Sequence, residues 1–219
     1  MSKSAAAKMG RPPSDESAIT RRRIVDAARV EIVDRGYAGA TFDLIGTRAG
    51  LTRGSVHYHF PNKQALFLDV VEQAEADVLA AVSALAETPG DTLLAELSDC
   101  VLAITAIDDD HSTAALVVSL ISNSRRPTHR RHRAVLDRII DAMNGHVAAL
   151  LARAIERGEM PADVDAGAWT SACTAMVWGM CAYCGLFGDV LFDDAADHHL
   201  VADRLGRLLT GPAVAGRAS

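Results

Sequence analysis

Apolar residues recur at helical spacing along most of the chain, and no stretch shows the alternation of a β-strand. The first such stretch predicts a helix from Thr20 to Arg35, with Ile24, Ala28 and Ile32 on one buried stripe. Gly36 follows it and is expected to end the helix. The pattern therefore predicts an all-α protein.

Two short helices joined by a tight turn are predicted between residues 41 and 60. Thr41 is expected to cap the first helix, and Gly50 to adopt the left-handed conformation that ends it. Thr52 is expected to cap the second helix, which Pro61 stops. Such a pair forms a helix-turn-helix unit, whose second helix enters the DNA major groove. That second helix carries groups that can bond to nucleic acid, and a glycine that leaves room for a phosphate backbone: Thr52, Arg53, Gly54, Ser55, His57, Tyr58 and His59.

Further residues around this unit follow a family pattern, namely Ile24-x-x-x-Ala28, Gly36-Tyr37, Thr41, Ile45, Ala49-Gly50-Leu51, Gly54, Tyr58-x-Phe60 and Lys63. The array resembles the DNA-binding domain of the TetR/AcrR family of transcriptional regulators, over about residues 20–75. Three positions depart from the family pattern. Gly46 stands where alanine is common, His57 replaces a frequent tyrosine, and the usual aromatic residue near Ile32 is absent.

The resemblance implies roles for individual residues. Thr41, Tyr58 and Lys63 are expected to hold phosphates, and His59 to contact the backbone or support Tyr58. Base edges are expected to face Thr52, Arg53, Ser55 and His57, with Arg53 best suited to read guanine.

Basic residues before the helix-turn-helix unit suggest additional DNA contacts. Arg11, in Gly10-Arg11-Pro12, is similar to a hook that lies in narrow minor grooves, although a solvated tail is an equal alternative. Arg21, Arg22 and Arg23 would crowd the first turn of the predicted helix, where the helix dipole disfavours cations. A nearby phosphate would offset that cost, so at least one is expected to contact the DNA backbone.

The rest of the chain predicts a helical body. Helices are expected at Asn62 to about Glu87, Asp91 to Ile107, Ser112 to Ser122, about 130–158, and twice within Val164 to Thr210. Residues 1–63 contain 11 Lys and Arg against 6 Asp and Glu, a charge of +5, whereas the remainder has 11 against 22, a charge of −11. This asymmetry separates a nucleic-acid-facing part from a part that is not. The expected organisation is a flexible basic arm (1–18), a helix-turn-helix domain (19–65), a ligand-binding and dimerisation domain (66–211) and a tail (212–219).

The resemblance also implies how the body works. The last two helices would pair with those of a second copy in a homodimer, which places two recognition helices ~34 to 36 Å apart on a palindromic operator. The middle helices would enclose a small, largely apolar effector whose binding lowers operator affinity, so that the protein acts as a repressor. Trp178 and Met143 are candidates to line that cavity, although core packing is the commoner role for such residues.

Other functions have weaker support. Cys181 and Cys184 lie three residues apart on one helix, with Cys173 two turns earlier, so a thiol or metal sensor is an alternative, although structural cysteines are commoner. A small helical enzyme would need a catalytic motif, and no Gly-rich loop, Gly-x-Ser-x-Gly or His-Glu-x-x-His occurs. We therefore expect no enzyme activity, no cofactor and no metal site. The basic segment 125–133 is expected to form a solvated loop that pairs with the acidic segment 108–110, in preference to a second DNA contact.

The composition indicates the cellular compartment of the protein. The chain has 219 residues, of which 49% are hydrophobic, and its mean hydropathy is +0.12. No uninterrupted apolar run reaches the ~18 to 20 residues of a membrane-spanning helix, and the N-terminus lacks an apolar signal core. The four cysteines do not form the pattern of a secreted disulfide framework. We therefore expect a cytoplasmic protein with no membrane partner.

Overall fold

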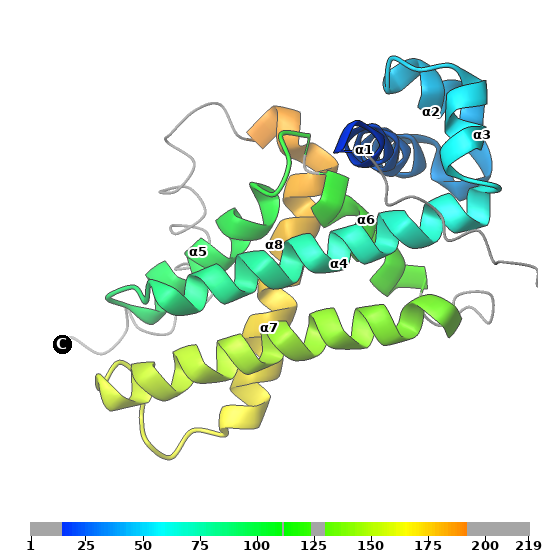
Figure 1. Cartoon of the computed structure of the whole chain (residues 1–219). Coiled ribbons are helices and arrows are strands. Elements are labelled where there is room, and N and C mark those ends of the chain that lie inside the picture. The colour runs from blue at the N-terminus through cyan, green and yellow to red at the C-terminus, as the bar shows by residue number, and fades with distance from the viewer. Residues whose placement is uncertain (1–14, 111, 124–129, 192–219) are drawn as a thin grey trace, which may run out of the picture.

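The structure is a computed structural model that describes residues 15–110, 112–123 and 130–191, with side chains described for 16–110, 112–122 and 133–183 (Figure 1). Within these ranges the chain forms helices and no strand, which confirms the all-α prediction. The helices are α1 (Asp15–Gly39), α2 (Phe42–Arg48), α3 (Arg53–His59), α4 (Lys63–Glu87), α5 (Leu93–Thr105), α6 (Ser112–Asn123), α7 (Arg130–Glu156) and α8 (Ala166–Leu191).

A small head made of α1, α2 and α3 sits on one end of the molecule (Figure 1). Its short helices begin at the predicted caps: Thr41 Oγ1 accepts from the Leu44 amide at 3.3 Å, and Thr52 Oγ1 from the Ser55 amide at 3.2 Å. The turn between them follows Gly50, whose φ of +64° is the expected left-handed conformation. The local caps thus determine where the head's short helices begin and end.

The turn between α2 and α3 passes close to Gly46, one of the positions that depart from the family pattern. A Cβ atom on Gly46 would lie 3.0 Å from the Leu51 carbonyl oxygen and 3.3 Å from the Thr52 carbonyl carbon. Glycine therefore lets the turn pass close against α2, whereas an alanine at this position would need a small shift of the turn.

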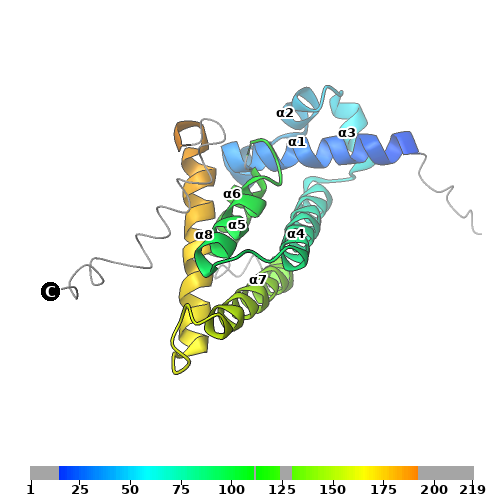
Figure 2. The same ribbon diagram turned by 90° about the vertical axis from the view of Figure 1, so that its left-hand side faces the viewer.

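The long helix α4 connects the head to the body. Its first turn is capped by Asn62, whose Oδ1 accepts from the Ala65 amide at 2.9 Å, next to the head. Further along, α4 packs against α7 and α5, while α8 crosses behind α4 and α7 (Figures 1 and 2). Both α5 and α6 pack against α8 as well, so the body surrounds a core continuous with that of the head.

Most predicted helix boundaries in the body are within about two residues of the observed ones, since cap residues and prolines mark them. The first helix, in the head, differs more, because it begins at Asp15 instead of Thr20. Residues 15–18 are therefore helical, and the prediction of a flexible arm up to residue 18 is wrong for them. The break at Gly36 is confirmed, with φ 70° and ψ 164°, although a last turn continues to Gly39.

Several predicted features lie outside the described residues. The second of the two predicted C-terminal helices, near 195–209, lies outside them, as do Arg11, the segment 124–129 and the tail 212–219. Among the helices that the structure describes, none is both long and apolar enough to cross a membrane.

Candidate DNA-binding site

The second helix of the helix-turn-helix unit, α3, presents its polar side chains on the surface of the head. Val56 is its buried residue, and Phe60, just after it, is fully buried. Tyr58 is 84% exposed, the largest exposure among the described large hydrophobic residues. The predicted contact residues on and before α3 are either exposed, as are Thr52, Arg53, Gly54, His57 and Tyr58, or half-buried, as are Ser55 and His59.

The candidate site lies in a groove of about 430 Å³ on the head. A larger groove of about 550 Å³ lies away from it, where the head meets the body. The groove of the candidate site is lined by residues from the start of α2, from α3 and from the start of α4. It brings together predicted contact residues from three helices and their caps: Thr41, Arg53, His57 and Lys63. The structure thus places predicted phosphate-contacting and base-contacting residues around one concave surface.

Lys63 is positioned by the residues that follow the kink in α1. Its Nζ donates to the Ala38 carbonyl oxygen at 3.1 Å and lies 4.7 Å from the centre of the Tyr37 ring. The Tyr37 ring in turn packs on Phe67, with ring centres 5.0 Å apart. Partial burial lowers the pKa of Lys63. The ammonium group therefore has a defined place at the beginning of α4.

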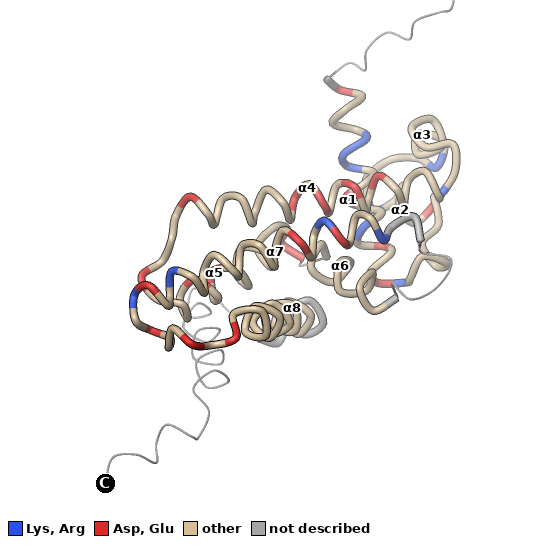
Figure 3. The backbone as a smooth tube through the Cα atoms, turned by 90° about the horizontal axis from the view of Figure 1, so that it is seen from below, with Lys and Arg blue, Asp and Glu red and all other residues tan. Residues whose placement is uncertain are grey.

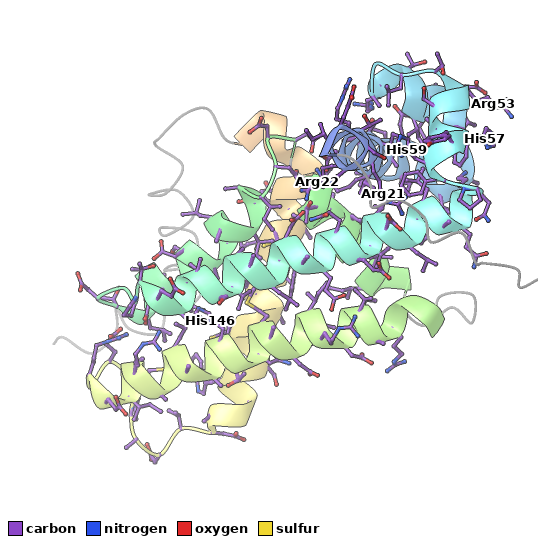
Figure 4. The ribbon with its side chains drawn as sticks, in the orientation of Figure 1. Arg21, Arg22, Arg53, His57, His59 and His146 are labelled. Carbon is purple, nitrogen blue, oxygen red and sulfur yellow. The ribbon has the colours of Figure 1, made fainter. Side chains whose placement is uncertain are left out.

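Two of the four side chains expected to face base edges, Arg53 and His57, are supported from α2. Arg53 Nη1 lies 3.1 Å from Asp43 Oδ2, and both side chains remain exposed to solvent. The His57 ring meets the buried Phe42 ring edge-on, with ring centres 4.6 Å apart. Figure 4 shows Arg53 and His57 on the outer side of α3.

The three consecutive arginines of α1, residues 21–23, have partners within the chain. Arg21 donates to the His59 carbonyl oxygen at 3.0 Å and to Asp69 at 2.5 Å, while Arg22 pairs with Asp77 at 3.3 Å. Arg23 donates to the Ala49 carbonyl oxygen at 2.6 Å. Because α1 starts at Asp15, these residues do not occupy its first turn, and the helix-dipole argument for phosphate contact was wrong.

The groove of about 550 Å³ lies where α1 and α2 meet the loop before α6. There Arg29, almost fully buried, donates from Nε to Ser112 Oγ at 2.7 Å, and its Nη2 lies 3.6 Å from Asp108 Oδ2. Burial favours a higher pKa for Asp110, but hydrogen bonds from Ser112 and with Asp108 outweigh it, and the pKa is lowered. The acidic segment thus pairs with Arg29 of the head, whereas most of its predicted partner, 125–133, lies outside the described side chains.

The body contains the two candidate effector-lining residues, and both are buried. Met143 is fully buried and Trp178 is 9% exposed. Among the described residues, Trp178 Nε1 and Thr174 Oγ1, one turn apart on α8, have no hydrogen-bond partner. A ligand with an acceptor atom could satisfy the indole N–H, which can only donate.

The cysteines provide little support for a thiol sensor. Burial raises the pKa of Cys100 to about 12, and it also raises the pKa of Cys173. A thiol of that kind is a poor nucleophile near neutral pH. Cys181 is fully buried, and the side chain of Cys184 lies outside the described residues. No cluster of three potential metal ligands occurs within the described part of the chain.

Comparison with known families identifies both parts of the chain. Residues 24–70 match the model of bacterial regulatory proteins of the tetR family, and residues 87–204, more than half of the chain, match the tetracyclin repressor-like C-terminal domain. The chain belongs to the TetR family. It is therefore a DNA-binding transcriptional regulator, with the helix-turn-helix head and helical body of that family.

Individual TetR-family relatives support the same assignment. The regulator SrpR of Pseudomonas putida is 29% identical over 162 residues, which cover 72% of this chain and 71% of SrpR. The repressor BepR of Brucella suis is 28% identical, over 75% of this chain and 79% of BepR. Of solved structures, the regulator MbdR of Azoarcus sp. CIB has a TM-score of 0.65 at 22% identity, covering 85% of this chain and 96% of MbdR. At this identity the likeness to MbdR shows the fold alone.

Sequence reasoning missed the residues that position the candidate DNA-contacting side chains of this TetR head. Asp43, Phe42 and Ala38 contact Arg53, His57 and Lys63 respectively, but none stands within the motif that identifies the family. Asp43 in the first turn of α2 was visible as a residue favoured by the helix dipole. Its pairing with Arg53, ten residues away, depends on the angle between the two helices, which no local pattern specifies.

Proposed function

We propose that this protein is a homodimeric repressor that leaves a palindromic operator when a small, largely apolar effector binds. The observation that carries the proposal is the single concave surface shared by α2, α3 and α4, with Thr41, Arg53, His57 and Lys63 around it. The proposed division of the chain is an arm, a DNA-binding domain to about residue 65 and a body to about residue 211.

The proposed DNA contacts follow from the chemistry and exposure of each side chain. Phosphates are bound by the Thr41 and Tyr58 hydroxyls and the Lys63 ammonium group, with His59 supporting Tyr58 through ring contact at 5.2 Å. Arg53 reads guanine in the major groove. Thr52, Ser55 and His57 face neighbouring base edges, Gly54 allows close approach, and Arg11 enters the minor groove.

The proposed dimer uses the outer face of α8. This helix carries no charged residue between Ala166 and Gly188, and small residues recur on its exposed side. An uncharged helix face of this kind needs a partner helix, which a second copy supplies. The exposed small residues in the described part of α8 include Ala168, Ala172, Ala175 and Gly179.

The proposed effector site lies inside the body near Trp178 and Met143. The B. subtilis regulator FadR, which shares this fold at 17% identity and a TM-score of 0.58 over 84% of this chain and 96% of FadR, was solved in complex with stearoyl-CoA. We propose a ligand that is mostly apolar and carries an acceptor atom for the indole N–H of Trp178. The ligand acts by binding better to the dimer whose recognition helices do not fit successive grooves.

Fluorescence anisotropy on DNA that flanks the protein's own gene, titrated in salt against a scrambled duplex, tests the proposal. Arg53→Ala is expected to lower affinity for the preferred DNA by ~1 to 3 kcal/mol. Arg133→Ala is the matched control, because Arg133 is equally exposed and pairs with Asp137 at 3.8 Å on α7, away from the head. Equal binding of both duplexes, or equal loss in both variants, would contradict the proposal.

A further inference from the structure

The ion pair between Asp43 and Arg53 joins two helices at the surface expected to face DNA. Asp43 Oδ2 and Arg53 Nη1 are 3.1 Å apart, and the side chains are 63% and 61% exposed. Exposed pairs of this kind contribute little to the stability of a fold. A carboxylate at this place also repels every phosphate that approaches the groove, so its presence weakens binding to DNA of any sequence.

Hydrogen bonds of the neighbouring residues fix the backbone at Asp43. Thr41 caps the helix through the Leu44 amide at 3.3 Å, and the Thr47 hydroxyl donates to the Asp43 carbonyl oxygen at 2.9 Å. Phe42, next in sequence, is buried beside the His57 ring of α3. The carboxylate therefore projects from a fixed point toward Arg53.

The pairing leaves part of the guanidinium group available. Arginine has five N–H donors in a planar fork, and Asp43 accepts from Nη1 alone. Within the described residues, no other hydrogen bond of Arg53 occurs. The edge formed by Nε and Nη2 is thus free to donate two parallel hydrogen bonds, which is the geometry that O6 and N7 of guanine accept.

We propose that Asp43 is a specificity-determining residue, which orients Arg53 so that its free edge reads guanine and keeps it from pairing with phosphates. The inference rests on the proposed function, since it concerns the same groove. Asp43 acts through Arg53 and is a positioning residue. It weakens binding to all duplexes and strengthens discrimination between them, as a repulsive element in a specific interface does.

The test begins with selection of duplexes from a randomised DNA pool by the wild-type protein. Affinities are then measured for the selected duplex and for one in which the selected guanine pair is replaced. Asp43→Asn is expected to reduce the discrimination between the two duplexes by roughly tenfold. It is also expected to tighten binding to scrambled DNA, because a negative charge has been removed.

The matched control is Asp34→Asn, which removes the same charge from the head. Asp34 is 49% exposed and pairs with Arg48 at 3.0 Å, so its loss leaves Arg53 untouched. Discrimination is expected to stay unchanged in this variant. A second test variant, Asp43→Ser, also removes the carboxylate. Thermal unfolding of both Asp43 variants is expected to lie close to that of the wild type, because a single first-turn charge and an exposed ion pair each contribute little.

A double-mutant cycle separates positioning from direct contact. If Asp43 acts through Arg53, Asp43→Asn has no effect on discrimination in the Arg53→Ala background. Full discrimination by Asp43→Asn, or an equal effect in both backgrounds, overturns the inference while the proposed function stands. Failure of the wild-type protein to select any sequence overturns the proposed function and the inference together.

Discussion

Lys63, a proposed phosphate contact, illustrates how the fold positions single side chains of the candidate DNA-binding site. Its Nζ lies between the Ala38 carbonyl oxygen and the Tyr37 ring, at the start of α4. Such a fixed ammonium group suits a phosphate, which carries no sequence information.

Lys63→Ala is therefore expected to weaken binding to every duplex by the same factor, because one phosphate contact is lost. The slope of log affinity against log salt is expected to become shallower by about 0.9. Anisotropy titrations at several salt concentrations provide the measurement, and Gln64→Ala, at an exposed neighbouring position, is the control. An unchanged slope would remove Lys63 from the phosphate contacts.

His146 is a second residue with a testable environment. It is 9% exposed on α7, and burial is the main cause that lowers its pKa. The nearby charge of Arg153 lowers the pKa further, and that of Glu96 opposes the shift. The small cavity beside His146 is also lined by Asp99 and by Thr88 to Gly90.

The lowered pKa makes stability depend on pH in a defined direction. Above about 6.5 the imidazole is neutral in both states, whereas below it the unfolded chain binds a proton that the folded protein does not. Stability is therefore lost as pH falls from about 6.5 through the lower folded pKa. His146→Gln is expected to lose less stability than the wild type between pH 7.5 and 5.5, measured by urea unfolding. A loss of stability in His146→Gln equal to that of the wild type would show that His146 does not cause the pH dependence.

At the scale of elements, the contact between α1 and α6 links the head to the body. Arg29 reaches Ser112 and Asp108 from α1, and Asp108 also accepts from the Thr113 amide at 2.9 Å. A buried guanidinium group joins the start of α6 to the head in this way.

Arg29→Met is expected to lower the free energy of unfolding by about 2 to 4 kcal/mol, because buried acceptors lose their charged donor. Urea unfolding at constant protein concentration measures the change. Arg35→Met is the control on the same helix, since Arg35 is 53% exposed and pairs with Glu31 one turn away. Similar losses of unfolding free energy in the two variants would show that the contact of Arg29 with α6 does not contribute to stability.

The elements also show what sequence can predict in this protein. Thr41, Thr52 and Gly50 were identified correctly, because a cap or a left-handed glycine depends on three or four neighbouring residues. The partners of Arg21, Arg22 and Arg29 are separated from them by 48, 55 and 83 residues, so no local pattern could reveal them. The candidate site was predicted as a set of side chains, and its supporting contacts required the packing of helices.

At the scale of the whole molecule, basic residues gather on the head and acidic residues follow α4 into the body. Basic residues occur on α1 and around α2 and α3, whereas α4 carries Asp69, Glu72, Glu75, Asp77 and Glu87 (Figure 3). Several of these carboxylates bind arginines of α1 and α7, so part of the acidity serves internal contacts.

The proposed dimer predicts the effect of a charge on the outer face of α8. A Cβ atom on Gly179 would meet no atom of the chain within 4 Å, so Gly179→Arg is compatible with the folded subunit. It is expected to yield a monomer of 23.2 kDa in light scattering and to abolish tight operator binding. Gly145→Arg on α7, where a Cβ atom is equally free, is the matched control and is expected to remain dimeric. A dimeric Gly179→Arg protein would place the interface elsewhere.

The contacts of α1 with α4 and with the loop before α6 bear on the construction of chimeric regulators. A head transplanted onto a foreign body at residue 63 would leave Arg21 and Arg22 without Asp69 and Asp77, and Arg29 without Asp108. The head therefore relies on contacts with the body and is not exchangeable between proteins on its own. A functional graft must carry the first half of α4 with it, and must rebuild an acceptor for Arg29 in its new host.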